Sequence, residues 1–230
     1  MGISKSGFAG LALVHVLTFA FLFGARDSTG IVLPMLIVGD IGAIRAFSQH
    51  AKWDHLWRTL PPACIGVIVG SLFMRRISDA TFTHVLGWIL LGLTLLYAIR
   101  SRLPESATNV PHSPFFAWVV GLLAGVTTML ANAGGPIMTL YLLTMGLAKL
   151  EFTGTVSWFF FVINVFKVPF SLSLGLIDHR TLGLNLVLAP AILVGLLIGR
   201  WLIKRVPQRL FDAFLLAFVA IAALRLIGVF

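Results

Sequence analysis

The stretch that decides the fold is MLANAGGPIMTLYLL, Met129 to Leu143, where an Asn, two Gly and a Pro interrupt an otherwise apolar run. Gly and Pro both weaken the interior of a helix. Backbone that leaves a helix at membrane depth is tolerated only where protein buries it or a cavity wets it. We therefore expect a membrane helix to break here, and the break to face a buried or wetted interior.

The composition extends this interpretation to the whole chain of 230 residues, which is 59% hydrophobic and 11% charged. A soluble domain is nearer half apolar and a quarter charged. The sequence predicts an all-α polytopic membrane protein with about seven to nine membrane segments. The apolar segments cover residues 7–25, 29–49, 57–74, 80–99, 114–131, 134–148, 152–175, 181–203 and 208–228.

The net charge of +9 fits a membrane protein better than a nucleic-acid binder, because Lys and Arg gather at the segment ends. Such residues set topology and contact anionic lipid headgroups. The single cysteine, Cys64, excludes an internal disulfide and a Cys-based metal cluster. His50 and His55 lack nearby acidic or Cys partners, so no metal is expected. Hydrolase and nucleotide-binding motifs are missing, so we expect neither an enzyme nor a cofactor.

A polar linker at residues 101–113 divides the chain into two transmembrane halves, 1–100 and 114–230. The halves look related, because GVIVGSLFMRRIS (66–78) echoes GLLIGRWLIKRVP (195–207). Repeats in transporters are often inverted across the membrane, which requires an odd number of crossings per half. Inversion of the whole half works if 29–49 is a re-entrant hairpin while 134–175 crosses twice. If 29–49 spans once, the first segments are not inverted, and both alternatives stay open.

The basic residues also predict which side is cytoplasmic. The loops on one predicted side hold most of them, so the positive-inside rule makes this side cytoplasmic and the C-terminus external. The side of the N-terminus depends on the hairpin and stays undecided. The residues on the richer side are Lys52, Arg58, Arg100, Arg102, Lys149, Lys204, Arg205 and Arg209; those on the other side are Arg75, Arg76 and Arg180.

The interrupted stretch itself predicts an anion site. A helix that starts near Pro136 would present free amides with partial positive charge. Gly134 and Gly135 would let a ligand approach the backbone, and Asn132 would cap the helix or donate to the ligand. Such a helix start is suited to binding an anion.

A counterpart lies in the first half at DSTGIVLP, Asp27 to Pro34. Ser28 and Thr29 can cap a helix, Gly30 can open the backbone, and Pro34 weakens the helix. Two broken segments at matching places in two halves are a pointer to a transport site. The alternative is ordinary connecting turns, or small residues that let helices pack closely.

Charged residues within the apolar segments are the other candidates. Lys167 lies three residues after Asn164, and is either a buried anion-binding charge or a lysine that snorkels to the interface. Arg45 can hold an oxyanion through two hydrogen bonds. His15, Asp40 or Lys167 could serve in proton coupling, whereas transport driven by the membrane potential needs none of them.

These residues resemble the TauE/SafE family of sulfite exporters. The resemblance lies in ANAGGPIMTLYLL (131–143), in FFFVINVFKVPFSLSLGLID (159–178), and in the first half from Gly30 to Gly70. It implies two related halves that export sulfite or organosulfonates across a bacterial inner membrane. Many members have a longer Gly run where this chain has the single Gly30, so the first-half site would depend more on Ser28 and Thr29. The family motif positions are Gly30, Pro34, Gly134, Gly135, Pro136, Asn164, Lys167 and Pro169.

The expected function is therefore secondary transport of a small anion by alternating access, with lipid and the anion as partners. An anion channel is a neighbouring alternative, and a membrane-embedded enzyme or an assembly factor belongs to a different class. Self-association is left open.

Overall fold

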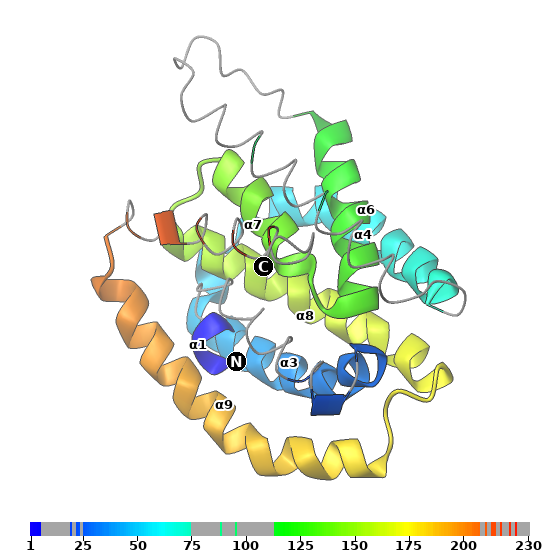
Figure 1. Ribbon diagram of the computed structural model, residues 1–230. Coiled ribbons are helices and arrows are strands. Elements are labelled where there is room, and N and C mark those ends of the chain that lie inside the picture. The colour runs from blue at the N-terminus through cyan, green and yellow to red at the C-terminus, as the bar shows by residue number, and fades with distance from the viewer. Residues whose placement is uncertain are drawn as a thin grey trace.

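The computed structural model describes residues 1–5, 19, 22–23, 25–74, 88, 95, 113–207, 210, 213–214, 217, 221 and 224. Within these residues every regular element is a helix (Figure 1). The elements are α1 (Gly2–Lys5), α3 (Ala25–Phe47), the 3₁₀ helix η1 (Ser48–His50), α4 (Trp53–Phe73), α6 (Pro114–Ala131), α7 (Gly134–Thr144), α8 (Lys149–Ser173) and α9 (His179–Arg205).

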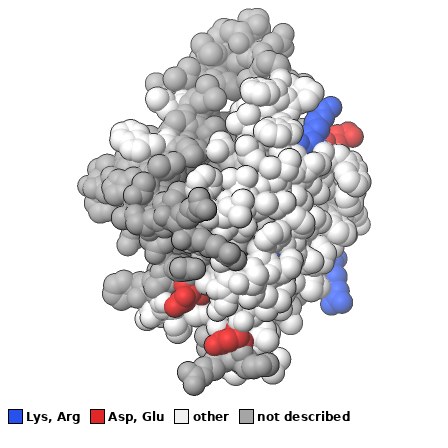
Figure 2. Space-filling view, turned by 90° about the vertical axis from the view of Figure 1, so that its right-hand side faces the viewer, with Lys and Arg blue, Asp and Glu red and all other residues white. Residues whose placement is uncertain are grey.

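Five of these helices are long and apolar enough to cross a membrane. They correspond to the predicted segments 29–49, 57–74, 114–131, 152–175 and 181–203. On the face shown in Figure 2, few charged side chains interrupt the described surface, as expected of a surface in contact with lipid. The candidate spans are Asp27–His50, Trp53–Phe73, Pro114–Ala131, Lys149–Ser173 and Thr181–Leu202.

The predicted segment 134–148 forms α7, which does not cross the membrane alone. Its 11 residues span roughly 16 Å at 1.5 Å per residue, about half of a hydrocarbon core. From Pro136 to Leu143 every side chain of α7 is buried, and the helix packs against α6 and α8. A helix that is apolar on all sides is stable only inside other protein, so α7 is an interior half-helix. Of the two alternatives left open by the sequence, the one in which 134–175 crosses twice is therefore wrong.

The predicted break in the first half is also wrong, because α3 runs without interruption from Ala25 to Phe47. Pro34 lacks an amide hydrogen and removes one hydrogen bond from the preceding turn. Neighbouring segments supply others there, since Asn132 Nδ2 donates to Thr29 O at 3.1 Å and Asn185 Nδ2 donates to Ile31 O at 3.0 Å. These bonds go to the carbonyls on either side of Gly30 O, the one that loses its donor to Pro34, and they tie this turn of α3 to the neighbouring segments. The segment 29–49 is thus one continuous helix and not a re-entrant hairpin.

Helix α8 lies at the centre of the bundle, where it packs against α3, α4 and α7. Helix α9 runs along the outside of the bundle beside α1 and α3 (Figure 1). The N-terminal end of α9 is closed by a capping box, in which Thr181 N donates to Asp178 Oδ1 at 2.7 Å. This arrangement brings α1, α3, α6 and α8 around the break between α6 and α7.

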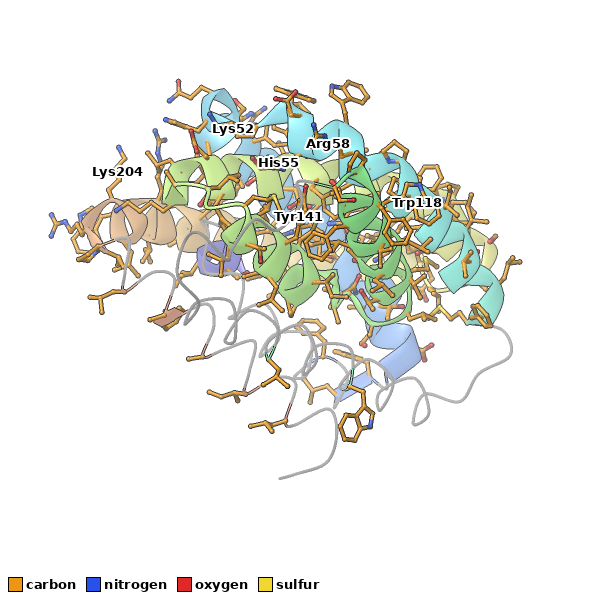
Figure 3. All side chains as sticks on the ribbon, turned by 90° about the horizontal axis from the view of Figure 1, so that it is seen from above. Lys52, His55, Arg58, Trp118, Tyr141 and Lys204 are labelled. Atoms are coloured by element: carbon orange, nitrogen blue, oxygen red, sulfur yellow. The ribbon has the colours of Figure 1, made fainter. Side chains whose placement is uncertain are left out.

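The N-terminal ends of α4 and α8 meet the C-terminal end of α9 at one end of the bundle. Lys52 pairs with Glu151 at 2.7 Å, and Lys149 Nζ donates to Val206 O at 2.6 Å. Lys52, Arg58 and Lys204 can be followed at this end in Figure 3. These contacts bring together basic residues that the sequence assigns to one side of the membrane.

The repeat, the division into halves and the total segment number stay predictions. Most of 7–25, 80–99 and 208–228, the linker up to His112, and the basic residues Arg75, Arg76, Arg100, Arg102 and Arg209 lie outside the described residues.

Small residues hold α4 and α6 together. Gly66 and Gly70 on α4, and Gly121 and Gly125 on α6, are spaced four apart and face the partner helix. A Cβ on Gly66 would lie 2.8 Å from Val126 N, and one on Gly125 would lie 2.8 Å from the carbonyl carbon of Ala63. Close backbone approach of this kind is typical of membrane helices, which gain little from hydrophobic association in lipid.

We predict that Gly125→Ala lowers the unfolding free energy in detergent by about 1–3 kcal/mol, because the added methyl meets backbone that cannot move aside. The control is Gly183→Ala on α9, where a Cβ would have nothing within 4 Å. Thermal unfolding of the two purified variants measures the difference. Equal melting temperatures for Gly125→Ala and wild type would contradict this account of the interface.

Candidate functional site

The site is built around the break between α6 and α7, which confirms the prediction for the second half. Helix α6 ends at Ala131, and Asn132 follows in the left-handed conformation, with φ 52° and ψ 27°. Asn is among the few residues other than Gly that adopt this conformation readily. Helix α7 begins at Gly134, and Pro136 lies in its first turn, where the missing N–H costs no hydrogen bond.

Lys167 on α8 binds the C-terminal end of α6. Its Nζ donates to Thr128 O at 2.6 Å and to Asn132 Oδ1 at 2.5 Å. A cation at a helix C-terminus satisfies the last carbonyls and opposes their partial negative charge. The side chain of Lys167 is 1% exposed, so it is a buried charge and not a snorkelling one.

Lys167 has no carboxylate within ion-pair distance in the described part of the chain. Its two hydrogen-bond acceptors are neutral, so no hydrogen-bonded carboxylate cancels its charge when it is protonated. A buried charge of this kind is costly, and in a membrane segment it marks a functional site by default.

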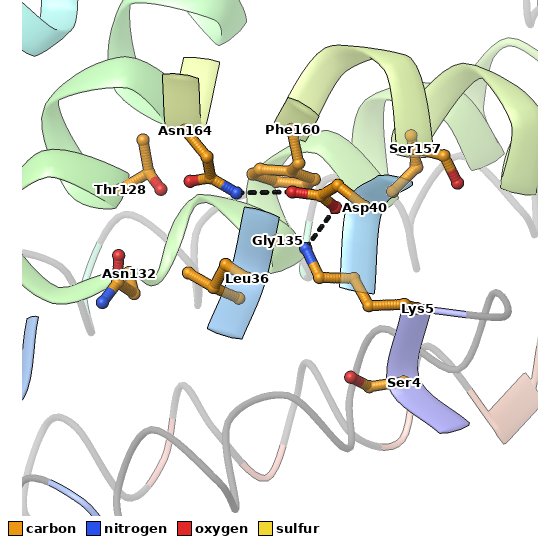
Figure 4. A pocket seen from close by; sticks show the side chains of 11 residues that line it. Ser4, Lys5, Leu36, Asp40, Thr128, Asn132, Gly135, Ser157, Phe160 and Asn164 are labelled. Carbon is orange, nitrogen blue, oxygen red and sulfur yellow. Dashed lines mark hydrogen bonds and ion pairs between the residues drawn. The ribbon is translucent and has the colours of Figure 1, made fainter. Parts of the chain in front are cut away.

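Asp40 on α3 is a second buried charge, with 0% exposure. Its carboxylate accepts two hydrogen bonds, from Lys5 Nζ to Oδ1 at 2.5 Å and from Asn164 Nδ2 to Oδ2 at 2.7 Å (Figure 4). Lys5 reaches it from α1 and also lies over the ring of Phe160, at 5.4 Å from the ring centroid. Asp40 therefore joins α3 to both α1 and α8.

A cavity of about 50 Å³ lies between these groups. One water needs roughly 10–15 Å³ of such volume, so the cavity holds a few waters or one small polyatomic anion. Lys5, Asp40, Asn132 and Asn164 give it a polar wall, and Leu36, Val156 and Phe160 give it an apolar one (Figure 4).

The two glycines of α7 have different surroundings. A Cβ on Gly134 would lie 2.7 Å from Ala124 O and 3.0 Å from Thr128 Cβ, so Gly134 lets α7 pack against α6. A Cβ on Gly135 would have nothing within 4 Å, and Gly135 lines the cavity. The residue before α7, Ala133, supplies no side-chain cap. The first turn of α7 therefore begins at the cavity with partial positive charge.

The side-chain oxygen of Asn164 accepts no hydrogen bond from the described residues. The Nδ2 of Asn164 is bound to Asp40, whereas the buried Oδ1 has no hydrogen-bond partner among the residues that the structure describes. A buried unpaired acceptor is expensive, which indicates that another group pairs with it in a functional state. Since Asn164 lines the cavity, that group is expected there.

The structure thus brings together only part of the predicted site. Asn132, Gly135, Asn164 and Asp40 line the cavity, and Lys167 lies directly behind Asn132. Arg45 is exposed near the end of α3, and His15 lies outside the described residues. Predicted residues that do not line the cavity are Ser28, Thr29, Gly30, Pro34, Arg45, Gly134, Pro136 and Lys167.

Gly30 does not interrupt the helix, and its role in the structure is to let α3 pack closely against Leu176. A Cβ there would lie 2.6 Å from Leu176 Cβ and closer still to the carbonyl group of Leu176. Its small size lets α3 touch the loop between α8 and α9. The nearby hydroxyl residues Ser28 and Thr29 are buried within the same helix.

Lys5 is the charged residue of the cavity wall that sequence reasoning missed, together with the uncharged Ser4, Leu36, Thr128, Val156, Ser157 and Phe160. Lys5 precedes the first apolar segment, where a lysine is typical of the charged residues that flank a membrane helix. The only available signal was Asp40, a carboxylate in an apolar segment, which needs a cationic partner. The sequence does not say which lysine that partner is.

We predict that Lys167→Met lowers the unfolding free energy by about 1–3 kcal/mol or more, because Thr128 O and Asn132 Oδ1 lose a charged donor. The control is Lys52→Met, which removes a half-exposed ion pair worth at most about 1 kcal/mol. Thermal unfolding in detergent compares the two variants. If both unfold at the same temperature, Lys167 does not hold the break.

Comparison with known proteins gives one match. A family model described as sulfite exporter TauE/SafE matches residues 2–226. The match includes every helix from α1 to α9, and so every residue that lines the cavity. No curated protein and no solved structure matches the chain.

Proposed function

Because the chain belongs to the TauE/SafE family of sulfite exporters, we propose that it is a secondary transporter for a small sulfur oxyanion, sulfite or an organosulfonate. It is a multi-pass membrane protein, with five described helices that can span a bilayer. The proposed binding site is the cavity at the α6–α7 break. The proposed direction is export across a bacterial inner membrane.

The observation that supports this site is its unbalanced buried charge. Lys5 and Asp40 form an ion pair, whereas both hydrogen-bond acceptors of Lys167 are neutral and Asp40 acts on it only through its field. When Lys167 is protonated, the charges of Lys5, Asp40 and Lys167 therefore sum to one positive charge. In a low-dielectric interior, an anion in the cavity removes that excess, and a cation increases it.

The donors around the cavity suit an oxyanion. Gly135 exposes backbone at the start of α7, and Lys5 and Asn164 have polar atoms in the opposite wall. The helix start contributes positive field, and the side chains contribute directed hydrogen bonds. Lys167 acts from behind by fixing Asn132, so in this proposal it holds the site and contributes charge without touching the anion.

Alternating access is proposed because the cavity lies between two groups of helices. Helices α4 and α6 form one tightly packed pair, and α3 packs with α8 and α9, while α8 also contacts α4. A relative movement of these groups would open the cavity to one side at a time. The family membership is consistent with a non-enzymatic function.

We also propose that the end of the bundle that holds Lys52, Lys149 and the end of α9 faces the cytoplasm, following the positive-inside rule. The 101–113 linker would then be cytoplasmic and the C-terminus external. Homo-oligomers are compatible with this arrangement.

We predict that Gly135→Leu abolishes saturable uptake of labelled sulfite into proteoliposomes, because the added Cβ has space and the side chain beyond it takes up room at the cavity. The control is Gly183→Leu on the exposed side of α9, which should transport at the wild-type rate. Organosulfonates and sulfate, tested in parallel, define which anion is carried. Lys167→Ala should reduce uptake together with stability.

Undiminished flux in both Gly135→Leu and Lys167→Ala would contradict the proposed site. Flux that neither saturates nor shows counterflow would indicate a channel. Chemical conversion of sulfite by the purified protein would indicate an enzyme, and stable co-purification with a partner without any uptake would indicate an assembly factor.

A further inference from the structure

We propose that Asp40 is a proton-binding site, which takes up one proton with each divalent oxyanion that enters the cavity. The inference rests on the proposed function, and adds to it the coupling of anion movement to proton movement. The geometry of Asp40, the charge around the cavity and the unpaired oxygen of Asn164 each support it.

The carboxylate of Asp40 occupies two donors that an oxyanion would use. Lys5 Nζ donates to one oxygen at 2.5 Å, and Asn164 Nδ2 donates to the other at 2.7 Å. Sulfur oxyanions present negatively charged oxygens that accept the same charge-assisted hydrogen bonds. In the empty cavity Asp40 thus takes the place of the anion, and an entering anion competes with it for Lys5 and Asn164.

Charge balance favours loss of the negative charge on Asp40 during this exchange. When Lys5 and Lys167 are both protonated and Asp40 is ionised, these three groups together carry one positive charge. A divalent anion would change this to one negative charge, with Asp40 in contact with the anion. A proton on Asp40 makes the region neutral and removes a like-charge contact in a low-dielectric site.

The side-chain oxygen of Asn164 can accept a hydrogen bond from the O–H group of protonated Asp40. At present the Nδ2 of Asn164 donates to Asp40 Oδ2, and its buried Oδ1 has no partner in the described part of the chain. After a proton binds Oδ2, rotation of the amide lets the new O–H donate to Asn164 Oδ1. The rotation also releases Nδ2, so both Nδ2 and Lys5 Nζ become available to the anion. In the open state, a hydronium ion of the surrounding water gives up the proton, so that one of its O–H bonds breaks as the O–H bond of Asp40 forms.

The surroundings of Asp40 direct the proton to its carboxylate. Lys5 faces it from α1, and Asn164 and Lys167 approach from α8. The α6 residues at the cavity are uncharged, as are Ile192 and Leu196 of α9, which lie near the glycines on either side of Asp40. Among the described residues, Asp40 is the only buried carboxylate.

The test compares sulfite binding to the full-length purified protein in detergent, by calorimetry, as the pH is raised from mildly acidic to mildly alkaline values. The variants are Asp40→Asn and, as a matched control, Asp54→Asn, an exposed carboxylate on α4. Sulfite itself titrates over this range, but its titration is common to all the proteins and cancels in the ratios of their Kd values.

We expect the Kd of wild type to rise relative to that of Asp40→Asn by about tenfold per pH unit, the slope for one proton taken up on binding. Wild type and Asp54→Asn should keep a constant ratio. Asp40→Asn can unfold because it leaves Lys5 unpaired, and in that case the double variant Lys5→Gln, Asp40→Asn replaces it, since both charges are then removed. The Kd of wild type should rise with pH relative to that of the double variant by the same factor.

Parallel pH profiles for wild type and the folded Asp40 variant, with sulfite bound by both, would overturn the proton site and leave the proposed function standing. Absence of sulfite binding by wild type at every pH would overturn the proposed function, and the proton site with it.

Discussion

The hydrogen bonds of Lys167 to the end of α6 are the contacts on which the rest of the site depends. Stopping a helix inside a membrane leaves carbonyl groups without partners, and lipid supplies none. Lys167 adds a charged donor to Thr128 O, which also accepts from Asn132 N, and it fixes Asn132, whose amide in turn reaches α3 at Thr29. One ammonium group therefore holds three helices around the break. Because the chain leaves the helix at Asn132, a second helix can start at the cavity, with Gly135 at its edge.

The same contacts produce the electrostatics of the cavity. Neutral acceptors make burial of Lys167 tolerable without cancelling its charge, whereas Lys5 and Asp40 cancel one another. The site is therefore positive but already contains a carboxylate bound to two of its donors. In the proposed mechanism an anion displaces that carboxylate, which links anion affinity to the charge on Asp40. Helix packing and the proposed anion binding thus depend on the same few side chains.

The sequence predicted the features that depend on local chemistry. The bounds of α6 and the break after it follow from Pro114, Asn132 and the two glycines, and the family follows from the same motif. The prediction of a broken helix at DSTGIVLP was wrong, because Asn132 and Asn185 supply hydrogen bonds that the local sequence does not reveal. Lys5 was missed for the same reason, since the partner of Asp40 lies 35 positions away. The sequence also predicted a full membrane segment at α7, because the same apolar run occurs whether protein or lipid surrounds the helix.

The central claim is that the break between α6 and α7 binds an oxyanion. Selenite has the shape and charge of sulfite, and its selenium can be located by anomalous X-ray scattering. A crystal of the protein soaked in selenite should show selenium in the cavity, within reach of the Gly135 backbone and the Asn164 side chain, with the Lys5–Asp40 pair separated. Selenium bound elsewhere, with the Lys5–Asp40 pair intact and the cavity unchanged, would contradict the claim.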